Sequence, residues 1–331
     1  MTKNIISIIG GAGFVGTRLA SRLINDSVDF DIYDKNTEKP SIKKTIKLDV
    51  RDGNSLNKIP SSSVIINLAA EHRDDVKPKQ LYYDVNVEGA SNVCKFARAS
   101  GINKIIFTSS VAIYGFAPPN TKEDGRPNYF NEYGRTKYLA EKEYIRWQKE
   151  DPKNRSLVII RPTVIFGEGN RGNVYNLLKQ IKSKKFIMIG KGNNYKSMAY
   201  VENVAAFIQF SISFKEGIHI YNYIDKPDIK MNDLIKKTRK LLFNKDNIGI
   251  KLPGFVGILI GHMADLLSML TKIKLPVSAI RVKKFMSTTQ FSSSIDKTTF
   301  KAPISLEDGL MKTINYEFIE DNSNKPTFDT E

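Results

Sequence analysis

Cysteine and histidine are scarce in this sequence, with one cysteine, Cys94, and three histidines among 331 residues. A single cysteine excludes an internal disulfide and fits a reducing compartment, and its apolar surroundings favour a buried core role for Cys94. The sequence also lacks repeats, low-complexity tracts and His, Cys, Asp or Glu clusters with metal-ligand spacing. We therefore expect no metal site.

Acidic residues are in deficit, because 35 Asp and Glu oppose 51 Lys and Arg and leave a formal net charge of +16. Such a balance favours an anionic partner or surface, whether nucleic acid, anionic lipid or a phosphorylated substrate. The basic residues are dispersed in short groups, without the Arg, Gly and aromatic interleaving or the zinc spacing of nucleic-acid modules. We expect no nucleic-acid partner, and most of these side chains should be solvated.

Apolar residues make up 41% of the chain, which is enough for a core in one large or two modest domains. The apolar run at residues 5–9 is too short for a signal peptide and leads into glycines, so it predicts a first strand. Alternating strand and helix patterns follow, as is typical of βα units in a parallel sheet. Strands are expected at residues 4–9, 29–33, 45–48, 64–68, 104–107 and 157–161, and helices at 81–99 and from the N-cap Ser305 to Phe318.

These patterns predict an α/β fold, a Rossmann-type doubly wound parallel sheet with a smaller C-terminal substrate-binding region. We assign residues 1–165 and roughly 198–225 to the Rossmann domain, 166–197 and 226–320 to the substrate-binding region, and 321–331 to a polar tail that we expect to be disordered. Right-handed crossovers place the carboxyl ends of parallel strands along one edge, where the ligand should bind.

Glycines at positions 10, 13 and 16 separate the first strand from a helical pattern. At this spacing Gly10, Gly13 and Gly16 permit a tight turn, close approach of a pyrophosphate to backbone N–H groups, and close helix packing. Asp34 ends the next strand, eighteen residues after Gly16, where a carboxylate binds the adenosine ribose and repels a 2′-phosphate. This context predicts NAD rather than NADP, with a simple turn role for Asp34 as the alternative.

Further cofactor contacts are expected at the start of the first helix and where small or apolar residues leave the strands. A flat ring or a ribose can lie against the backbone there. The residues concerned are Phe14, Val15, Asp49, Val50, Leu68, Ala69 and Ala70.

Tyr133 and Lys137 stand four residues apart at the start of a helix-compatible run, so both side chains lie on one helical face. A lysine ammonium beside a phenol favours the phenolate, which can take a proton from a sugar hydroxyl. Ser110 follows the strand at 104–107 and can hydrogen-bond the same hydroxyl. Tyr and Lys four apart also occur by chance on surface helices, but the serine and the glycine turn favour catalysis. Tyr133 and Lys137 are expected to contact the cofactor as well.

Several motifs together resemble a known family. The glycine turn, Asn67-Leu68-Ala69-Ala70, Ser110, Tyr133-xxx-Lys137 and Arg161-Pro162-Thr163 resemble the extended short-chain dehydrogenase/reductase family, the NAD-dependent sugar epimerases and dehydratases. Segments 70–76, 82–87, 166–175 and 195–201 are similar to the bacterial undecaprenyl-diphosphate-linked N-acetylglucosamine 4-epimerases of O-antigen assembly. The resemblance spans essentially the whole chain and adds Pro162 to the expected cofactor contacts.

The resemblance implies an NAD-dependent isomerase that interconverts GlcNAc and GalNAc on undecaprenyl diphosphate, within lipopolysaccharide biosynthesis. Tyr133 would remove the proton of the C4 hydroxyl, with Ser110 polarising the oxygen, while NAD takes the C4 hydride and returns it to the other face. The resemblance also implies a homodimer in the cytoplasm, peripheral on the inner face of the cell membrane.

Other functions share parts of this pattern. Related dehydratases carry an Asp-Glu pair where this sequence has Val111 and Ala112, so dehydration is not expected. A soluble UDP-N-acetylhexosamine 4-epimerase or an NAD(P)-dependent 4-keto-sugar reductase would use the same triad, and both stay open as alternatives. A non-catalytic NAD-binding scaffold is disfavoured because Tyr133 and Lys137 are both present.

The expected substrate contacts are Ser110, His72, Arg73, Asn170, Arg171, Lys196 and Arg281. His72 and Arg73 follow the fourth strand, near the expected nicotinamide pocket. The resemblance implies that Asn170, Arg171 and Lys196 lie near the substrate diphosphate. Arg281 is a further phosphate candidate, with a surface role as the alternative. Nucleotide-sugar epimerases usually carry arginine at the position of Lys196, and because lysine lacks the bidentate fork, the case for a nucleotide substrate is weaker.

Residues 252–271 form a long apolar stretch, but Pro253, His262 and Asp265 argue against a membrane span. Small or polar residues recur every three to four positions opposite a wide apolar face, and they are Gly257, Gly261, Asp265, Ser268 and Lys272. With Lys251, Lys272 and Lys274 as flanks, this pattern predicts an amphipathic helix over 255–271 at an anionic membrane surface. A core helix of the substrate region is the alternative.

Overall fold

Seven strands, all paired in parallel, form the main sheet of the computed structural model, which describes residues 5–61, 64–73, 76–271, 273, 275 and 277–329. In spatial order they are β10 (Gly217–Tyr223), β6 (Ser156–Pro162), β5 (Lys104–Thr108), β4 (Val64–Asn67), β1 (Ile6–Ile9), β2 (Phe30–Asp34) and β3 (Thr45–Lys47). The six strands expected from the sequence all lie in this sheet. The Rossmann-type prediction is confirmed.

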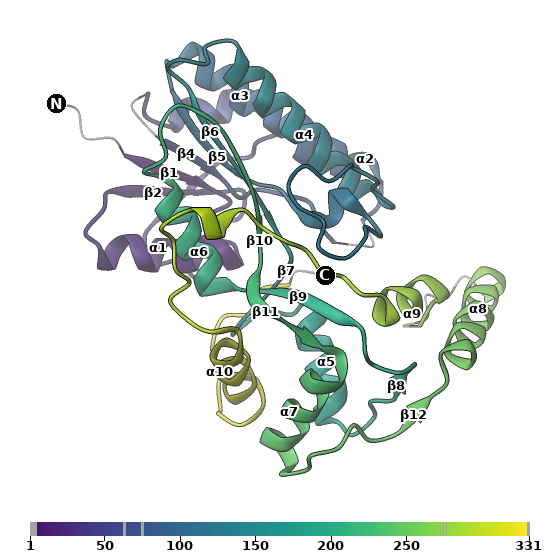
Figure 1. The fold of residues 1–331 in the computed structure, drawn as a ribbon. Coiled ribbons are helices and arrows are strands. Elements are labelled where there is room, and N and C mark those ends of the chain that lie inside the picture. The colour runs from purple at the N-terminus through teal and green to yellow at the C-terminus, as the bar shows by residue number, and fades with distance from the viewer. Residues whose placement is uncertain are drawn as a thin grey trace.

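Helices cover both faces of the sheet (Figure 1). On one face lie α1 (Phe14–Asn25) and α6 (Val201–Ser211), and on the other α3 (Gly89–Ala99) and α4 (Glu132–Lys149). Apolar strand residues alternate between the two layers, so that Ile105 packs with α3 and α4 whereas Ile106 packs with α1 and α6. This double cover explains why the strands read as nearly continuous apolar runs.

The helix expected at 81–99 is a continuous helical run with a wider turn inside it. It consists of α2 (Gln80–Tyr83), a π-helical turn at Asp84–Glu88, and α3. Cys94 lies on α3 and is buried in the core, and burial raises the pKa of its thiol to about 12, which confirms the expected structural role. Short 3₁₀ turns lie at η1 (Gly53–Lys58), η3 (Val111–Tyr114) and η4 (Ile295–Lys297).

A second region surrounds two small sheets. One contains β11 (Asp225–Lys230), β9 (Tyr195–Tyr200) and β7 (Val164–Phe166), and the other pairs β12 (Lys251–Leu252) with β8 (Met188–Ile189). Helices α5 (Asn173–Lys182), α7 (Met231–Phe243) and α10 (Leu306–Phe318) share a core with β9. The Ser305 hydroxyl accepts a hydrogen bond from the Asp308 N–H at 3.1 Å, so the predicted N-cap of α10 is confirmed.

Helix α8 (Gly254–Thr271) and helix α9 (Ala279–Met286) lie at one side of the molecule, with α8 at the right-hand edge of Figure 1. Among the residues of α8, only Gly257 and Gly261 are buried. Its apolar side chains are exposed, from 37% at Ile258 to 75% at Phe255. The alternative of a core helix is therefore wrong.

The small-residue stripe of α8 faces the protein. A Cβ at Gly257 would lie 2.3 Å from Ile189, and one at Gly261 would lie 2.7 Å from the Cα of Ala279. The Asp265 carboxylate accepts a hydrogen bond from the Ala279 N–H at 3.0 Å. The helix thus packs through its polar side onto β8 and α9, and it presents its apolar side outward. The predicted flanking residues Lys272 and Lys274 lie outside the described residues.

The C-terminal segment is ordered near Phe328, so the prediction of a disordered tail is wrong there. The Phe328 N–H donates to Gly169 at 2.8 Å, and its carbonyl accepts from the Arg171 N–H at 2.8 Å. The Phe328 ring packs against Phe14, with ring centroids 5.6 Å apart. One aromatic side chain and two backbone hydrogen bonds are enough to fix an otherwise polar segment.

Candidate active site

Ser110 and Tyr133 come together because η3 and the first turn of α4 pack closely. The Asn131 side chain caps α4 by accepting from the Gly134 N–H at 2.9 Å. A Cβ at Gly134 would lie 2.4 Å from the carbonyl oxygen of Ala112, so only glycine permits this approach. The Ser110 side chain lies near enough to the Tyr133 phenol to lower its pKa. The structure therefore joins two of the three predicted catalytic groups.

Burial raises the pKa of the Tyr133 phenol to about 12, and the Ser110 side chain partly offsets that rise. This direction is opposite to the sequence prediction, in which Lys137 lowers the pKa of Tyr133. The Lys137 ammonium lies instead over the Phe107 ring, 4.2 Å from its centroid, and its side chain is only 2% exposed. Burial lowers the pKa of Lys137 to about 7, so in the chain alone it carries only part of a positive charge at neutral pH.

A buried ion pair fixes α4 to the central sheet. The Arg161 guanidinium on β6 donates to the Glu141 carboxylate at 2.7 and 2.9 Å, with side chains 7% and 1% exposed. Arg161 also donates to the Tyr114 hydroxyl at 2.6 Å. Glu141 was not predicted from the sequence, although it follows Lys137 by four residues on the same helical face, where a third polar residue is a usable signal.

Asn86 connects α4 to the loop that follows β4. Its amide donates to the Thr136 hydroxyl at 2.9 Å and to the Glu71 carbonyl at 3.0 Å, and it accepts from the Glu71 N–H at 2.9 Å. This buried link places the loop that carries His72 beside the helix that carries Tyr133 and Lys137.

The glycine turn forms a tight cradle at the start of α1. A Cβ at Gly10, whose φ is +76°, would lie 2.7 Å from the Ala69 nitrogen, and one at Gly16 would lie 2.5 Å from the Gly11 Cα. Gly13 begins α1 without a side-chain cap, so the N–H groups of the first turn lack an intrahelical or side-chain acceptor. Such a cradle fits the diphosphate of a dinucleotide.

Other predicted cofactor residues lie at or beyond the carboxyl ends of the parallel strands. The Asp34 carboxylate accepts from the N–H of Ala12 at 3.2 Å and from that of Asn36 at 3.0 Å, so it supports the turn and is half-buried. Asp49 pairs with Arg51, whose hydrogen bonds hold the pKa of the Asp49 carboxyl below its usual range.

Val50 is buried, and a Cβ at Gly89 would lie 2.7 Å from its side chain. Leu68, Ala69 and Ala70 are half-buried beyond β4, and Pro162 is buried at the end of β6. The side chains of Val50 and Pro162 thus contribute mainly to packing in the chain alone, and their contact with a cofactor stays a prediction.

The predicted diphosphate contacts already have protein partners. Lys196 donates to the carbonyls of Lys284 at 2.9 Å and Ser287 at 2.7 Å, at the C-terminal end of α9. Arg171 pairs with Glu317 at 2.7 Å. Asn170 donates to the Ile165 carbonyl at 3.0 Å and accepts from the Gly172 N–H at 2.9 Å. Their role on a substrate diphosphate stays a prediction.

Three predicted substrate contacts remain. Arg73 forms a salt bridge with Glu71 at 3.0 Å and is exposed. His72 is half-buried, and burial lowers its pKa, so the neutral imidazole is favoured. Arg281 is exposed on α9. The structure brings His72 near α4 through Asn86, and contact of Arg73 and Arg281 with a substrate stays a prediction.

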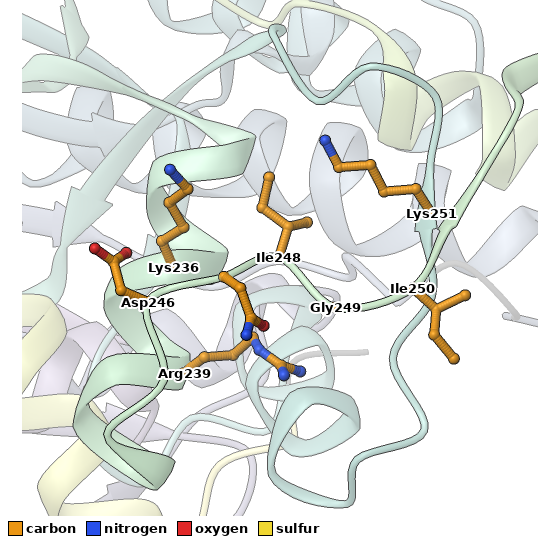
Figure 2. A pocket seen from close by; sticks show the side chains of 8 residues that line it. Lys236, Arg239, Asp246, Ile248, Gly249, Ile250 and Lys251 are labelled. Carbon is orange, nitrogen blue, oxygen red and sulfur yellow. The ribbon is translucent and has the colours of Figure 1, made fainter.

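A basic hollow lies elsewhere on the surface, between α7 and the segment that leads into β12 (Figure 2). Lys236, Arg239 and Lys251 line it together with Asp246. None of the predicted catalytic or cofactor-binding residues lines this hollow, so it is distinct from the triad.

Comparison with known proteins agrees with the geometry. The family model described as "NAD dependent epimerase/dehydratase family" matches residues 6–223. The chain belongs to this family. A relative from Escherichia coli O157:H7, N-acetyl-alpha-D-glucosaminyl-diphospho-ditrans,octacis-undecaprenol 4-epimerase, is 45% identical over 336 residues and covers 100% of both chains.

Two further proteins resemble this chain at lower sequence identity. The UDP-glucose 4-epimerase of Vibrio cholerae is 25% identical over 95% of each chain. A solved UDP-glucose 4-epimerase of Thermotoga maritima shares the fold with a TM-score of 0.73 at 18% identity, covering 94% of this chain and 98% of that one. This chain is thus an enzyme of the NAD-dependent epimerase/dehydratase family with a Rossmann-type fold.

Proposed function

We propose that this protein is a 4-epimerase that interconverts GlcNAc and GalNAc while the sugar is attached to undecaprenyl diphosphate, in the assembly of O-antigen or a related surface polysaccharide. The observation that carries the proposal is that one chain combines the Ser110–Tyr133 pair and Lys137 with an outward-facing apolar helix, α8. The relative that is 45% identical over the full length, named as an epimerase of such a lipid-linked sugar, supports it.

Side chains of the protein transfer the proton to and from the sugar C4 oxygen. Tyr133 accepts the hydroxyl proton, and Ser110 hydrogen-bonds the same oxygen while the carbonyl forms. When bound, NAD⁺ would supply the hydride acceptor, and its positive charge would favour the Tyr133 phenolate. Lys137, whose pKa is lowered to about 7 by burial, would hold a ribose hydroxyl of the cofactor. Once the keto sugar had turned, the hydride would return to the other face of C4 and Tyr133 would return the proton to the C4 oxygen.

The residues after Ser110 favour epimerisation over dehydration. Val111 and Ala112 occupy η3, and neither can act as an acid or a base. An elimination across C5 and C6 would need such groups near the sugar. The product therefore keeps its C6 hydroxyl.

The outward face of α8 supports contact with the inner face of the cytoplasmic membrane. Exposed residues on this helix include Phe255, Leu259, Met263, Leu266, Leu267 and Leu270. The helix is long and apolar enough to cross a membrane by composition, but its small-polar stripe is bound to β8 and α9, which fits a helix lying in the interface. The net charge of +16 suits anionic headgroups.

The enzymatic test compares two substrates. Purified protein with NAD is incubated with GlcNAc-diphosphoundecaprenol and, separately, with UDP-GlcNAc, and GalNAc formation is measured for each. We expect turnover of the lipid-linked sugar. Turnover of the nucleotide sugar alone would reject the proposal in favour of a soluble UDP-N-acetylhexosamine epimerase, and reduction of a 4-keto sugar without epimerisation would favour a reductase.

The membrane test is flotation with vesicles of phosphatidylethanolamine and phosphatidylglycerol. Leu266→Ser with Leu270→Ser should leave the protein at the bottom of the gradient, whereas the wild type floats. Ile319→Ser is the matched control, because Ile319 is 56% exposed but lies outside α8. Equal flotation of the α8 variant and the wild type would exclude α8 as the contact. A homodimer, which the family resemblance implies, is tested by sedimentation in the same buffer.

A further inference from the structure

Two exposed phenylalanines lie next to the catalytic residues in the sequence and touch each other in the structure. Phe116 follows η3, and Phe130 precedes Tyr133 by three residues, so its Cα lies within about 11 Å of that of Tyr133 even in extended chain. The rings are 5.2 Å apart between centroids and are 38% and 42% exposed. An exposed aromatic pair at this position offers an apolar surface beside the sugar site.

Two lysines of α9 lie over this aromatic pair. The Lys283 ammonium is 5.2 Å from the Phe116 centroid, and the Lys284 ammonium is 4.5 Å from the Phe130 centroid. Across the described residues, neither ammonium is paired with a carboxylate. Both charges are therefore available to an anion that approaches the rings.

Helix α9 is held at both ends, and each end connects it to a different part of the molecule. At its start, the Ala279 N–H donates to Asp265 of α8. At its end, Lys196 donates to the carbonyls of Lys284 and Ser287. The helix thus links the outward apolar face of α8 with the aromatic pair near Tyr133. The Lys196 ammonium is occupied by α9, whereas the Lys283 and Lys284 ammonium groups lie over the aromatic pair.

We propose that Phe116, Phe130, Lys283 and Lys284 form the subsite for the polyprenyl diphosphate of the substrate. The first isoprene unit packs on the two rings, and the diphosphate is held by the two lysines. This inference rests on the proposed function, since it names how that site takes a lipid-linked sugar. Charge complementarity and the position between α8 and Tyr133 both favour this occupant. A diphosphate there leaves its sugar on the Tyr133 side and its chain on the α8 side.

The test uses farnesyl diphosphate, a water-soluble probe that carries the diphosphate and three isoprene units. Its dissociation constant is measured by calorimetry with NAD present, for the wild type, for Phe116→Ala with Phe130→Ala, and for Lys283→Gln with Lys284→Gln. Each double variant should bind at least about tenfold more weakly, because each loses charge-assisted hydrogen bonds or apolar contact.

Lys43→Gln with Lys44→Gln is the matched control. These lysines are also adjacent and exposed, and the Lys43 ammonium lies 4.4 Å from the centroid of the Phe30 ring, but they precede β3 at the far edge of the main sheet. The control should bind within about twofold of the wild type. An equal loss in the control, unchanged binding in both test variants, or no binding by the wild type would each overturn the subsite.

Turnover measurements distinguish a failure of the subsite from a failure of the proposed epimerase activity. For the lipid-linked GlcNAc, the test variants should show a raised KM with little change in kcat, and Lys283→Arg with Lys284→Arg should restore the KM. If the wild type converts the lipid-linked sugar while the variants keep its KM, the subsite fails and the function stands. If the wild type binds farnesyl diphosphate through these residues but converts no lipid-linked sugar, the function fails and the subsite stands.

Discussion

Strand β6 and helix α8 are both rich in apolar residues, yet only the strand is covered by the rest of the chain. Every residue of β6 is buried between helices on the two faces of the sheet. On α8, Gly257 and Gly261 are buried and the leucines are exposed. Exposing so much apolar surface is unfavourable in water, which is the basis for the proposed contact of α8 with a membrane. The strand is covered within the chain, whereas among the described residues the outer side of α8 is not.

The largest expected effect is a loss of epimerase turnover without a loss of vesicle binding. Tyr133→Phe should lower epimerase turnover about 10³-fold, since it removes the proton acceptor, while flotation with vesicles stays at the wild-type level. The α8 variant Leu266→Ser with Leu270→Ser should show the reverse pattern in detergent solution, with near-normal turnover and no flotation. Turnover is measured by GalNAc formation. Wild-type turnover in Tyr133→Phe would show that Tyr133 is not the base.

Replacing a large apolar side chain by alanine should lower the free energy of unfolding much more in β6 than in α8. Ile159→Ala in β6 should lower the free energy of unfolding by about 2–5 kcal/mol, because it leaves a cavity in a core where Ile159 is 0% exposed. Leu267→Ala in α8, where Leu267 is 54% exposed, should change it by less than about 0.5 kcal/mol. Urea denaturation followed by the fluorescence of Trp147, the one tryptophan, measures both. Similar losses would mean that α8 is covered within the chain.

The pH dependence of stability should report the burial of Lys137. Its pKa is about 7 when folded and near 10.4 in an unfolded chain, so between these values the unfolded chain binds more protons. The free energy of unfolding therefore rises with pH in that window, by about 1 kcal/mol per pH unit from this group. Lys137→Met should remove this contribution to the rise of the free energy of unfolding between pH 7 and 9.5. Lys312→Met, at an exposed position, should leave the rise unchanged. Parallel curves for the wild type and Lys137→Met would contradict the burial.

The smallest effect concerns the inner side of α8. Asp265→Ala removes the hydrogen bond from the Ala279 N–H and should weaken the contact between α8 and α9 by about 1 kcal/mol. Hydrogen exchange in the peptide that begins α9 should become several-fold faster, with vesicle binding retained because the apolar face is unchanged. Unchanged exchange would show that Gly261 alone sets this contact.

The main sheet and the catalytic pair could be predicted from the sequence because their signals are local. Strand patterns, the glycine turn and Tyr133-xxx-Lys137 each depend on residues that are close in the chain. Three features were beyond such reasoning. The raised pKa of Tyr133 depends on burial by distant segments. The Glu141–Arg161 pair joins residues twenty positions apart. Phe328 is fixed by partners near Gly169 and Phe14.

Helix α8 shows a different limit of prediction. Its two-sided pattern was visible in the sequence, and so was the alternative of a core helix. A hydrophobic stripe indicates which side seeks cover, but it does not say whether that cover is the protein or a membrane. Only the packing of Gly257 and Gly261 against Ile189 and Ala279 determines that the apolar side faces outward.

The packing of Phe328 against Phe14 affects where a purification tag can be placed. Phe14 opens the helix that follows the glycine turn, so only three residues would separate a purification tag fused after Glu331 from Phe328, whose ring packs on Phe14. A bulky C-terminal fusion should therefore loosen cofactor retention. An N-terminal tag avoids that segment.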